Sequence, residues 1–331
     1  MIFLGIETSC DETSASLVEN GTRVLSNIIS SQVNVHAITG GVVPEVASRH
    51  HLESINAVID KALRQANMEI CEISAVAVTN RPGLIGALLV GVSAAKAIAY
   101  CLNKPLFPVH HIEAHIYANW LNNNRVEFPY ICLVVSGGHT IVFLIRGHGS
   151  YEILGRTRDD AAGEAFDKSA RVIGLSYPGG KEIDRIAKGG NSAAVSLPRA
   201  KLSGRKYDFS FSGLKTSVLY GHKDIKNTGI SQQDWAASIQ EAIVDVLVNN
   251  TLSAADDYGV ANVALAGGVA GNSRLQQRMK QECALRGISF HCPDAIFCTD
   301  NAAMIAAAGF HLSNRSSRDI SCDTIASESL A

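Results

Sequence analysis

The chain has 331 residues, of which 47% are hydrophobic and 18% charged, and its formal net charge at pH 7 is −2. That length is enough for two lobes, each with a full hydrophobic core. A chain with this charge has no overall attraction to a phosphate backbone, so binding of a nucleic acid would need a local basic surface or a helper subunit.

Cysteine usage and the apolar segments favour a cytoplasmic protein. The eight cysteines form no CxxC pair and several lie in apolar runs, as in residues 131–133, which is typical of reduced, buried thiols. The opening MIFLGIETSCDE carries three acids and no basic stretch, unlike a signal peptide. The most apolar segment, residues 84–102, contains Lys96, which favours a buried helix over a membrane span.

The first third of the chain predicts three strands followed by alternating helices and strands. We expect strands over 2–8, 13–18 and 23–30, a helix over 54–66, a strand over 75–79, a helix over 84–102, a strand over 106–109 and then a helix carrying histidines. The helix over 54–66 has apolar residues at i, i+3, i+4 and i+7 spacing and no helix breaker.

The same order then begins again. Strands are expected over 130–135, 140–146 and 151–156 with a helix from near residue 160, and after a polar, glycine-rich excursion a helix over 234–257, a strand over 262–266, a helix over 273–286, a strand over 288–291 and a last helix from 300. Two βββαβαβα units predict an α/β fold: a duplicated actin-like architecture of the ASKHA, or ribonuclease H-like, type with an interlobe cleft. We expect an N-terminal lobe over 1–109, with a C-terminal helical segment 302–331 packing back on it, and a C-terminal lobe over 110–301 with an insert near 176–232.

Glycine-rich turns lie at matching places in the two halves. In SGGHT, residues 136–140, Gly137 and Gly138 leave successive backbone N–H groups open to phosphate oxygens. A second turn, LAGGVAGNSRL at 265–275, follows a strand and opens a helix, although its glycines do not fit the GxGxxG dinucleotide fingerprint. Each turn alone could be an ordinary hairpin or tight connection. Together they favour a nucleotide site.

The stretch HHIEAH, residues 110–115, suggests a metal site. His111 and His115 lie four apart, on one face of a helix, where both can reach one ion. Glu113 sits between them, roughly 200° around the helix from the first histidine, and so cannot activate a metal-bound water as in a metallopeptidase. The duplication brings the start of the last helix to the same region, which makes Asp300 the candidate third ligand. The alternatives are two packed or surface histidines, and an Asp300 that only caps its helix.

Seven blocks along nearly the whole chain carry a family resemblance. They are GIETSCDETS, GGVVPEVASRHH, HHIEAH, VSGGHT, FSFSGLKT, LAGGVAGN and TDNAAM. In this order and spacing they resemble the bacterial tRNA adenosine threonylcarbamoyltransferases of the TsaD type, once regarded as glycoproteases. The resemblance implies transfer of the threonylcarbamoyl group from threonylcarbamoyl-AMP to the exocyclic amine of the adenosine 3′ of the anticodon, in tRNAs that read codons beginning with adenine.

By position, the resemblance implies the following site residues. The metal ligands and catalytic residues are His111, His115 and Asp300, and the adenylate contacts are Val134, Val135, Ser136, Gly137, Gly138, Asp167, Gly180, Asp184 and Asn272. The cofactor implied is one divalent metal, iron(II) or else zinc, acting as a Lewis acid on the carbamoyl oxygen while AMP leaves. The partners implied are tRNA, a paralogous inactive subunit of the TsaB type, a small P-loop ATPase of the TsaE type and a synthase that supplies the intermediate.

The chain departs from the family pattern at two positions. Val134 stands where archaeal relatives carry a metal-binding tyrosine, and Arg81 replaces a residue that is usually glycine, which puts a close backbone approach at that loop in doubt.

Binding of tRNA is expected to involve a basic segment, residues 199–226. It has an excess of five positive charges with Tyr207, Phe209 and Phe211 interleaved, and the alternative is a solvated insert. The competing functions are a metallopeptidase, a small-molecule kinase, which would need a catalytic carboxylate and Mg²⁺ instead of imidazoles, and a non-catalytic nucleotide-binding scaffold.

Overall fold

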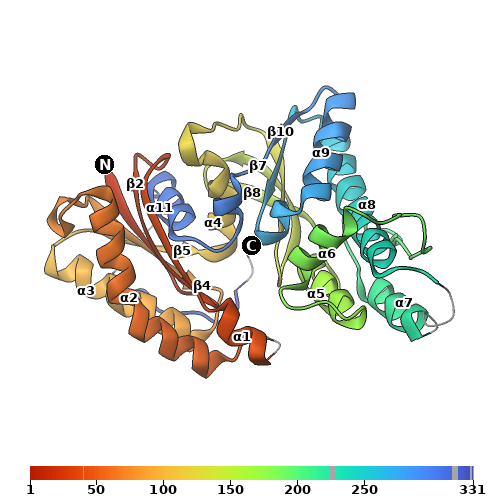
Figure 1. Cartoon of the computed structure of the whole chain (residues 1–331). Helices are drawn as coiled ribbons and strands as arrows, with labels where there is room; N and C mark the ends of the chain where they lie inside the picture. Colours follow the sequence, from red (N-terminus) through yellow and green to blue (C-terminus); the bar gives the residue numbers. More distant parts are fainter. Residues whose placement is uncertain (40, 224–228, 315–319, 329, 331) are drawn as a thin grey trace. The chain divides into compact units, whose positions relative to one another are not determined.

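The computed structural model describes residues 1–39, 41–223, 229–314, 320–328 and 330, and the chain divides into two compact units (Figure 1). Unit 1 comprises residues 1–125 and 293–331, and unit 2 comprises residues 126–292. The sequence-based boundaries, after residues 109 and 301, differ from these. The histidine helix and Asp300 therefore both belong to unit 1, whereas the prediction had placed them in the C-terminal lobe.

Unit 1 is built on a five-stranded mixed sheet in the order β3-β2-β1-β4-β5. Its elements are β1 (Ile2–Glu7), β2 (Glu12–Glu19), β3 (Arg23–Ser31), α1 (Val33–Thr39), α2 (Pro44–Ala66), η1 (Ile70–Glu72), β4 (Ala75–Arg81), α3 (Ile85–Cys101), β5 (Leu106–His110), α4 (His111–Tyr117), η2 (Ala118–Asn123), α10 (Ala295–Cys298) and α11 (Ala302–His311). β1 pairs antiparallel with β2 and parallel with β4, so the sheet changes direction at its centre.

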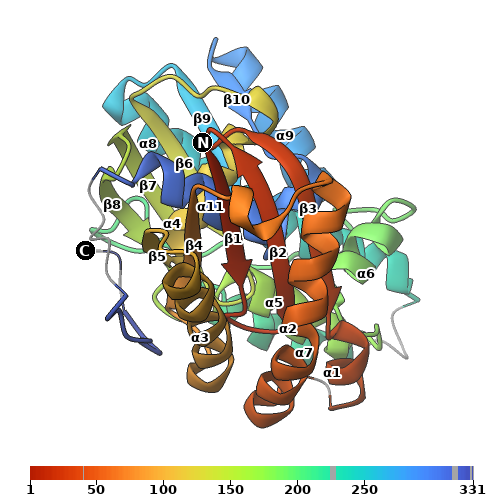
Figure 2. The same ribbon diagram turned by 90° about the vertical axis from the view of Figure 1, so that its left-hand side faces the viewer.

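Helices cover both faces of this sheet because its central strands alternate apolar residues between two cores. Leu4 and Ile6 of β1 pack with α2 and α3, whereas Phe3 packs with α4 and α11. Figure 2 shows α2 and α3 side by side along the strands. α11 lies very close to the sheet: a Cβ on Gly5 would come within 2.1 Å of the Ala302 carbonyl oxygen. The small residues of α11 thus let its first turn sit directly on β1.

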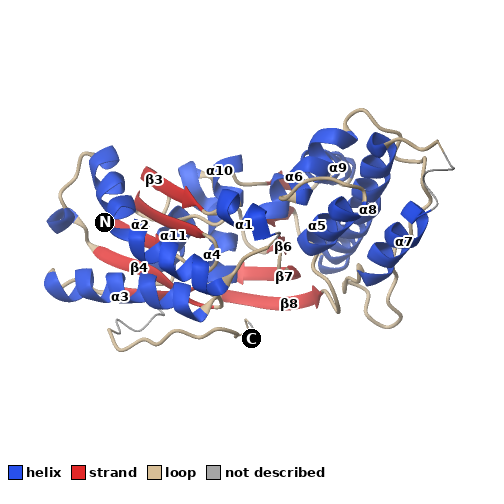
Figure 3. Ribbon diagram, turned by 60° about the horizontal axis from the view of Figure 1, so that its bottom comes forward, coloured by secondary structure: helices blue, strands red, loops and turns tan. Residues whose placement is uncertain are grey.

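Unit 2 repeats the same topology with the strand order β10-β9-β6-β7-β8. Its elements are β6 (Tyr130–Val135), β7 (Thr140–Gly147), β8 (Ser150–Arg156), α5 (Ala162–Val172), α6 (Gly179–Ala187), α7 (Ser212–Lys223), α8 (Gln232–Tyr258), β9 (Asn262–Ala266), η4 (Gly268–Gly271), α9 (Ser273–Leu285) and β10 (Ser289–His291). As in unit 1, the first strand pairs antiparallel with the second and parallel with the fourth. Helices α5 to α9 form the helical part of this unit (Figure 3).

The duplication predicted from element order is confirmed by these two sheets. The predicted strands all form, with ends shifted by a residue or two. The helix predicted over 54–66 is longer and starts at Pro44, where proline suits the first helical turn. Among the described residues, no helix is both long and apolar enough to cross a membrane.

Candidate metal centre and adenylate residues

The three predicted metal ligands lie together in unit 1. Nε2 of His115 is 3.3 Å and Nε2 of His111 is 3.5 Å from Oδ1 of Asp300. One ligand atom from each residue lies within 4.8 Å of the other two, so the cluster could hold a metal ion. Two imidazoles and one carboxylate are a donor set that suits iron(II) or zinc. The residues therefore fit the implied metal.

The positions of these side chains follow from two helix starts. α4 begins at His111 directly after β5, and His111 and His115 sit one turn apart with ring centroids separated by 4.7 Å. Asp300 precedes α11, whose N-cap is Asn301: its side chain accepts a hydrogen bond from the Met304 N–H at 3.1 Å. The alternative that Asp300 serves only as a helix cap is therefore wrong.

The start of α11 is fixed by the sheet beneath it. The Ala302 N–H donates to the Ser14 hydroxyl at 2.9 Å, and Gly5 leaves room for the Ala302 carbonyl. Strands β1 and β2 thus fix the first residue of α11, two positions after Asp300. The ligand group consists of His111, His115 and Asp300 among the residues that the structure describes.

The cluster is buried and strongly coupled electrostatically. Burial lowers the pKa of His111, but the carboxylates of Asp300 and Glu7 outweigh it and raise that pKa to about 9. Burial and the neighbouring charge of His111 lower the pKa of His115 despite its contact with Asp300. The carboxylates of Asp300 and Glu7 thus surround the two imidazoles, and a divalent cation bound there would neutralise their negative charge.

Glu7 was not predicted as part of the site. Its side chain is fully buried at the end of β1, and its Oε2 lies 3.1 Å from Nδ1 of His111. Burial raises the pKa of Glu7, but the charge and hydrogen bond of His111 outweigh it, so the pKa is lowered overall. The only signal in the sequence was an acid at the carboxyl end of a central strand.

The predicted adenylate residues all lie in unit 2, around the carboxyl ends of the parallel strands β6 and β9. Val134 and Val135 are fully buried in β6, so residues 136–138 are the accessible part of this segment. Gly137 and Gly138 are exposed, and a Cβ on either would meet nothing within 4 Å. Across the described chain, no hydrogen bond engages their N–H groups. The turn therefore presents two backbone donors to solvent, as anion binding requires.

Close packing fixes this turn from two sides. A Cβ on Gly163, in the first turn of α5, would come within 2.6 Å of the Ser136 carbonyl oxygen. Gly267, with φ of +89°, leads from β9 into η4, and a Cβ there would come within 2.4 Å of the Val135 carbonyl oxygen. Glycine is needed at both places.

Asp167 and Gly180 meet at the start of α6. The Gly180 N–H donates to Oδ1 of Asp167 at 3.2 Å, and burial raises the pKa of that carboxyl group. Asp167 of α5 thus accepts a backbone N–H from the first turn of α6, whose N-cap residue is Pro178, and its contact with an adenylate stays a prediction. Asn272 caps α9, its Oδ1 accepting from the Leu275 N–H at 3.0 Å.

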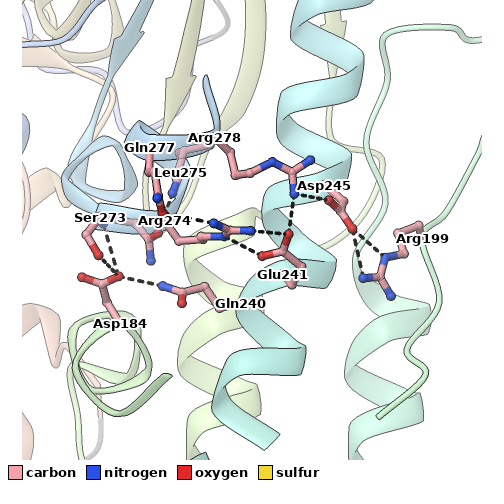
Figure 4. A network of polar contacts seen from close by, with 11 residues as sticks. Asp184, Arg199, Gln240, Glu241, Asp245, Ser273, Arg274, Leu275, Gln277 and Arg278 are labelled. Carbon is pink, nitrogen blue, oxygen red and sulfur yellow. Dashed lines mark hydrogen bonds and ion pairs between the residues drawn. The ribbon is translucent and has the colours of Figure 1, made fainter. Parts of the chain in front are cut away.

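Asp184 is held in a polar network between α6, α8 and α9 (Figure 4). Its Oδ1 accepts from Gln240 Nε2 at 2.7 Å, from the Ser273 hydroxyl at 2.8 Å and from the Ser273 N–H at 3.2 Å. Farther along α8, Glu241 pairs with Arg274 at 2.7 Å and also with Arg278 of α9. Asp184 thus contacts Ser273, the residue that follows Asn272 in the sequence.

The basic segment 199–226 combines exposed cations, among them Lys201, Arg205 and Lys206, with two buried aromatic residues. Phe209 and Phe211 are buried and stacked in the core, with ring centroids 6.3 Å apart. Most of its cations pair with acids: Arg199 with Asp245, Arg205 with Asp208, Lys206 with Asp257 and Lys215 with Asp160. Asp224 and Lys226 lie outside the described residues. Phe209 and Phe211 are therefore structural, whereas Tyr207 is partly exposed and its hydroxyl donates to Asp257. The ion pairs neutralise part of the local excess of charge.

The unusual Arg81 is engaged by the C-terminal tail. Its guanidinium pairs with Glu328 and donates to the Asn80 side chain at 2.8 Å. The tail backbone also bonds the end of β4 and the loop that follows it, since the Ile325 N–H donates to the Asn80 carbonyl at 2.9 Å and the Gly83 N–H donates to the Ala326 carbonyl at 3.2 Å. The tail therefore packs along the loop that follows β4.

The sequence relationship decides the family. The family model described as TsaD, tRNA N6-adenosine threonylcarbamoyltransferase, matches residues 23–307. The chain belongs to this family. It is 53% identical over 311 residues to the tRNA N6-adenosine threonylcarbamoyltransferase of Clostridium perfringens (strain SM101 / Type A), covering 93% of this chain and 92% of the relative. It is 55% identical over 315 residues to that of Symbiobacterium thermophilum, covering 94% and 91%.

Membership of the threonylcarbamoyltransferase family identifies the chain as a transferase that acts on N6 of adenosine in tRNA. This confirms the resemblance and the activity inferred from the seven sequence blocks. The metallopeptidase, kinase and scaffold alternatives are set aside.

Solved structures of low sequence identity share the fold. Component A of the (R)-2-hydroxyglutaryl-CoA dehydratase of Acidaminococcus fermentans has a TM-score of 0.56 at 13% identity, covering 95% of this chain and all of that one. A HypF structure from T. kodakarensis has a TM-score of 0.62 at 16% identity, covering 96% of this chain and 48% of that one. These neighbours confirm the actin-like ASKHA fold class.

Proposed function

We propose that the chain takes threonylcarbamoyl-AMP as its donor and holds one divalent metal, iron(II) in preference to zinc, on His111, His115 and Asp300. The observation that carries the metal is the convergence of two imidazole nitrogens and a carboxylate oxygen within 4.8 Å. A metal bound there supplies Lewis acidity to the carbamoyl oxygen of the donor.

The adenylate is proposed to bind at the turn of residues 136–138. Its phosphate would accept hydrogen bonds from the N–H groups of Gly137 and Gly138, which stabilise the charge on AMP as it leaves. Asp167, Gly180, Asp184 and Asn272 surround the ends of β6 and β9, where their polar groups would hold the ribose and base. Asp184 is the best supported of these, because three hydrogen bonds fix its carboxylate.

The acceptor is proposed to be the adenosine 3′ of the anticodon in tRNAs that read codons beginning with adenine. The paired charges of residues 199–226 support weak intrinsic affinity for tRNA, with further affinity supplied by partners. The proposed partners are the TsaB-type subunit, the TsaE-type ATPase and the synthase that makes threonylcarbamoyl-AMP. A cytoplasmic location stays a prediction from composition.

The test is mass spectrometry of tRNA nucleosides after incubation with threonylcarbamoyl-AMP, the partner proteins and the chain. Wild type should form threonylcarbamoyladenosine, and His111→Ala should lose both bound metal and product while keeping its circular dichroism spectrum. His50→Ala is the control, because His50 precedes the buried His51 on α2 and belongs to no predicted site. Full activity of His111→Ala would overturn the ligand assignment.

A further inference from the structure

The buried carboxylate of Glu7 lies behind the metal ligands, on the side of His111 opposite Asp300. Nδ1 of His111 is 3.1 Å from Oε2 of Glu7, whereas Nε2 of the same ring faces Oδ1 of Asp300 at 3.5 Å. A ring with one nitrogen toward each carboxylate can serve as a ligand through only one of them. The hydrogen-bond partner of the second nitrogen fixes the tautomer of the ring and so determines which nitrogen can bind the metal.

The hydrogen bonds of Glu7 identify it as an acceptor. Oε2 accepts from the Thr79 hydroxyl at 2.6 Å, and Oε1 accepts from the Ser9 N–H at 2.5 Å. A carboxylate that already receives two donors has no proton to give, so the contact with His111 requires a proton on Nδ1 of the ring. The Ser9 hydroxyl, 3.2 Å from the same nitrogen, can accept as a second partner.

We propose that Glu7 is a positioning residue of the metal centre: its carboxylate accepts the Nδ1–H of His111 and so leaves Nε2 as the ligand atom. The inference rests on the metal site proposed above and adds residues from β1 and β4 to it. Thr79 acts one step farther out, since its hydroxyl fixes the Glu7 oxygen that faces the ring. Neither residue belongs to the ligand group.

The spatial arrangement supports a dedicated role. Glu7 and Thr79 are both fully buried, and they lie 104 and 32 positions from His111 in the sequence, on different strands of the unit 1 sheet. A buried carboxylate is costly unless several donors satisfy it, and here three groups on three elements do so. By contrast, Nδ1 of His115 has no hydrogen-bond partner among the described residues. The contact with Glu7 therefore orients His111 and not His115.

The experiment measures the affinity of the full chain for Zn²⁺ by competition with a chromophoric chelator, and the visible absorption spectrum of the Co²⁺-loaded chain. Glu7→Gln should weaken Zn²⁺ binding by about 10–100-fold and change the Co²⁺ spectrum, because the amide favours the wrong tautomer of His111. Thr79→Val should weaken binding by a smaller factor. Two controls are matched: Glu19→Gln, which removes a glutamate in an exposed ion pair on β2, and Thr251→Val, which removes a buried hydroxyl on α8. Both should bind as wild type does.

A double-mutant cycle separates positioning from a general structural effect. In a His111→Ala background, which loses the metal bound at the site, the weak residual Zn²⁺ affinity should be the same with and without Glu7→Gln, because the effect of Glu7 passes through His111. A loss as large as in the wild-type background would overturn the inference, and so would wild-type affinity and spectrum in Thr79→Val and Glu7→Gln. If Glu7→Gln does not fold, Thr79→Val decides. Wild type that binds neither ion would overturn the metal site itself, whereas binding that is insensitive to these variants overturns only the role of Glu7.

Discussion

Adding one methyl group at Gly163 should disable the anion-binding turn while leaving the fold intact. A Cβ there would lie 2.6 Å from the Ser136 carbonyl oxygen and 2.7 Å from the Gly137 Cα. Ordinary van der Waals contact starts near 3.4 Å, so the turn would have to move by about 0.8 Å. Backbone donors must be placed within about 0.5 Å to bind a reacting group productively. The displacement therefore exceeds the tolerance of the site.

The effect on stability should be much smaller than the effect on binding. Alanine is favoured over glycine in a helix by about 1 kcal/mol, and overpacking costs about 1–3 kcal/mol, so the free energy of unfolding should fall by at most about 2 kcal/mol. A displacement near 1 Å in a catalytic site can cost about 100-fold in rate. We therefore expect kcat/KM for tRNA modification to fall by about that factor, with a matching weakening of AMP binding.

Isothermal titration with AMP and single-turnover modification of tRNA would check this, with Gly189→Ala as the control. A Cβ on Gly189 meets nothing within 4 Å, so this variant should bind AMP like wild type. AMP affinity unchanged in Gly163→Ala would refute the reasoning that the turn of residues 136–138 holds the phosphate.

Three further predictions concern unit 2. Gln240→Leu removes one of three donors to Asp184 and should weaken AMP binding by about fivefold, measured by titration, with kcat unchanged. Burial raises the pKa of Glu241, but Arg274 and Arg278 outweigh it and lower that pKa, so its stabilisation is present above pH 4.5 and lost as the pH falls through the lowered value. Glu241→Gln should therefore cost about 2 kcal/mol at pH 7 in denaturant titrations, a difference that shrinks in acid; a constant difference would contradict the pairing. Phe209→Ala should cost about 3–5 kcal/mol of stability without weakening tRNA binding by the folded fraction, and a selective loss of tRNA affinity would show that its ring meets tRNA after all.

Local patterns were sufficient to predict the strands and long helices of this fold. The sequence of β1 and its partner strands consists of apolar runs between polar turns, which predicts strands. The repeated order of elements predicted the two matching sheets. The short helices α1, α6, α7 and α10 were missed because each has too few turns for a periodic signal or lies in a polar excursion. The domain boundary differed because β5 runs directly into α4, with no linker to mark a division.

The site was predicted unevenly for a physical reason. His111 and His115 are related by helical spacing, which the sequence displays directly, and Asp300 followed from the repeat. Glu7 meets His111 only through the pairing of β1 with β4 and of β4 with β5, a long-range contact without a local pattern. Phe209 and Phe211 were expected on a tRNA-binding surface but form a buried stacked pair. Composition alone does not distinguish these two arrangements.

The contact between the C-terminal tail and the loop after β4 bears on how far the chain can be shortened. The family match stops at residue 307, yet α11 continues to His311 and the backbone of residues 323–326 is bonded to Asn80 and Gly83. A fragment trimmed to the matched region would lose the last turn of the helix that carries Asp300 at its start, and would leave polar groups of that loop unsatisfied. Affinity tags and truncations at this end are therefore expected to perturb unit 1, which carries His111, His115 and Asp300.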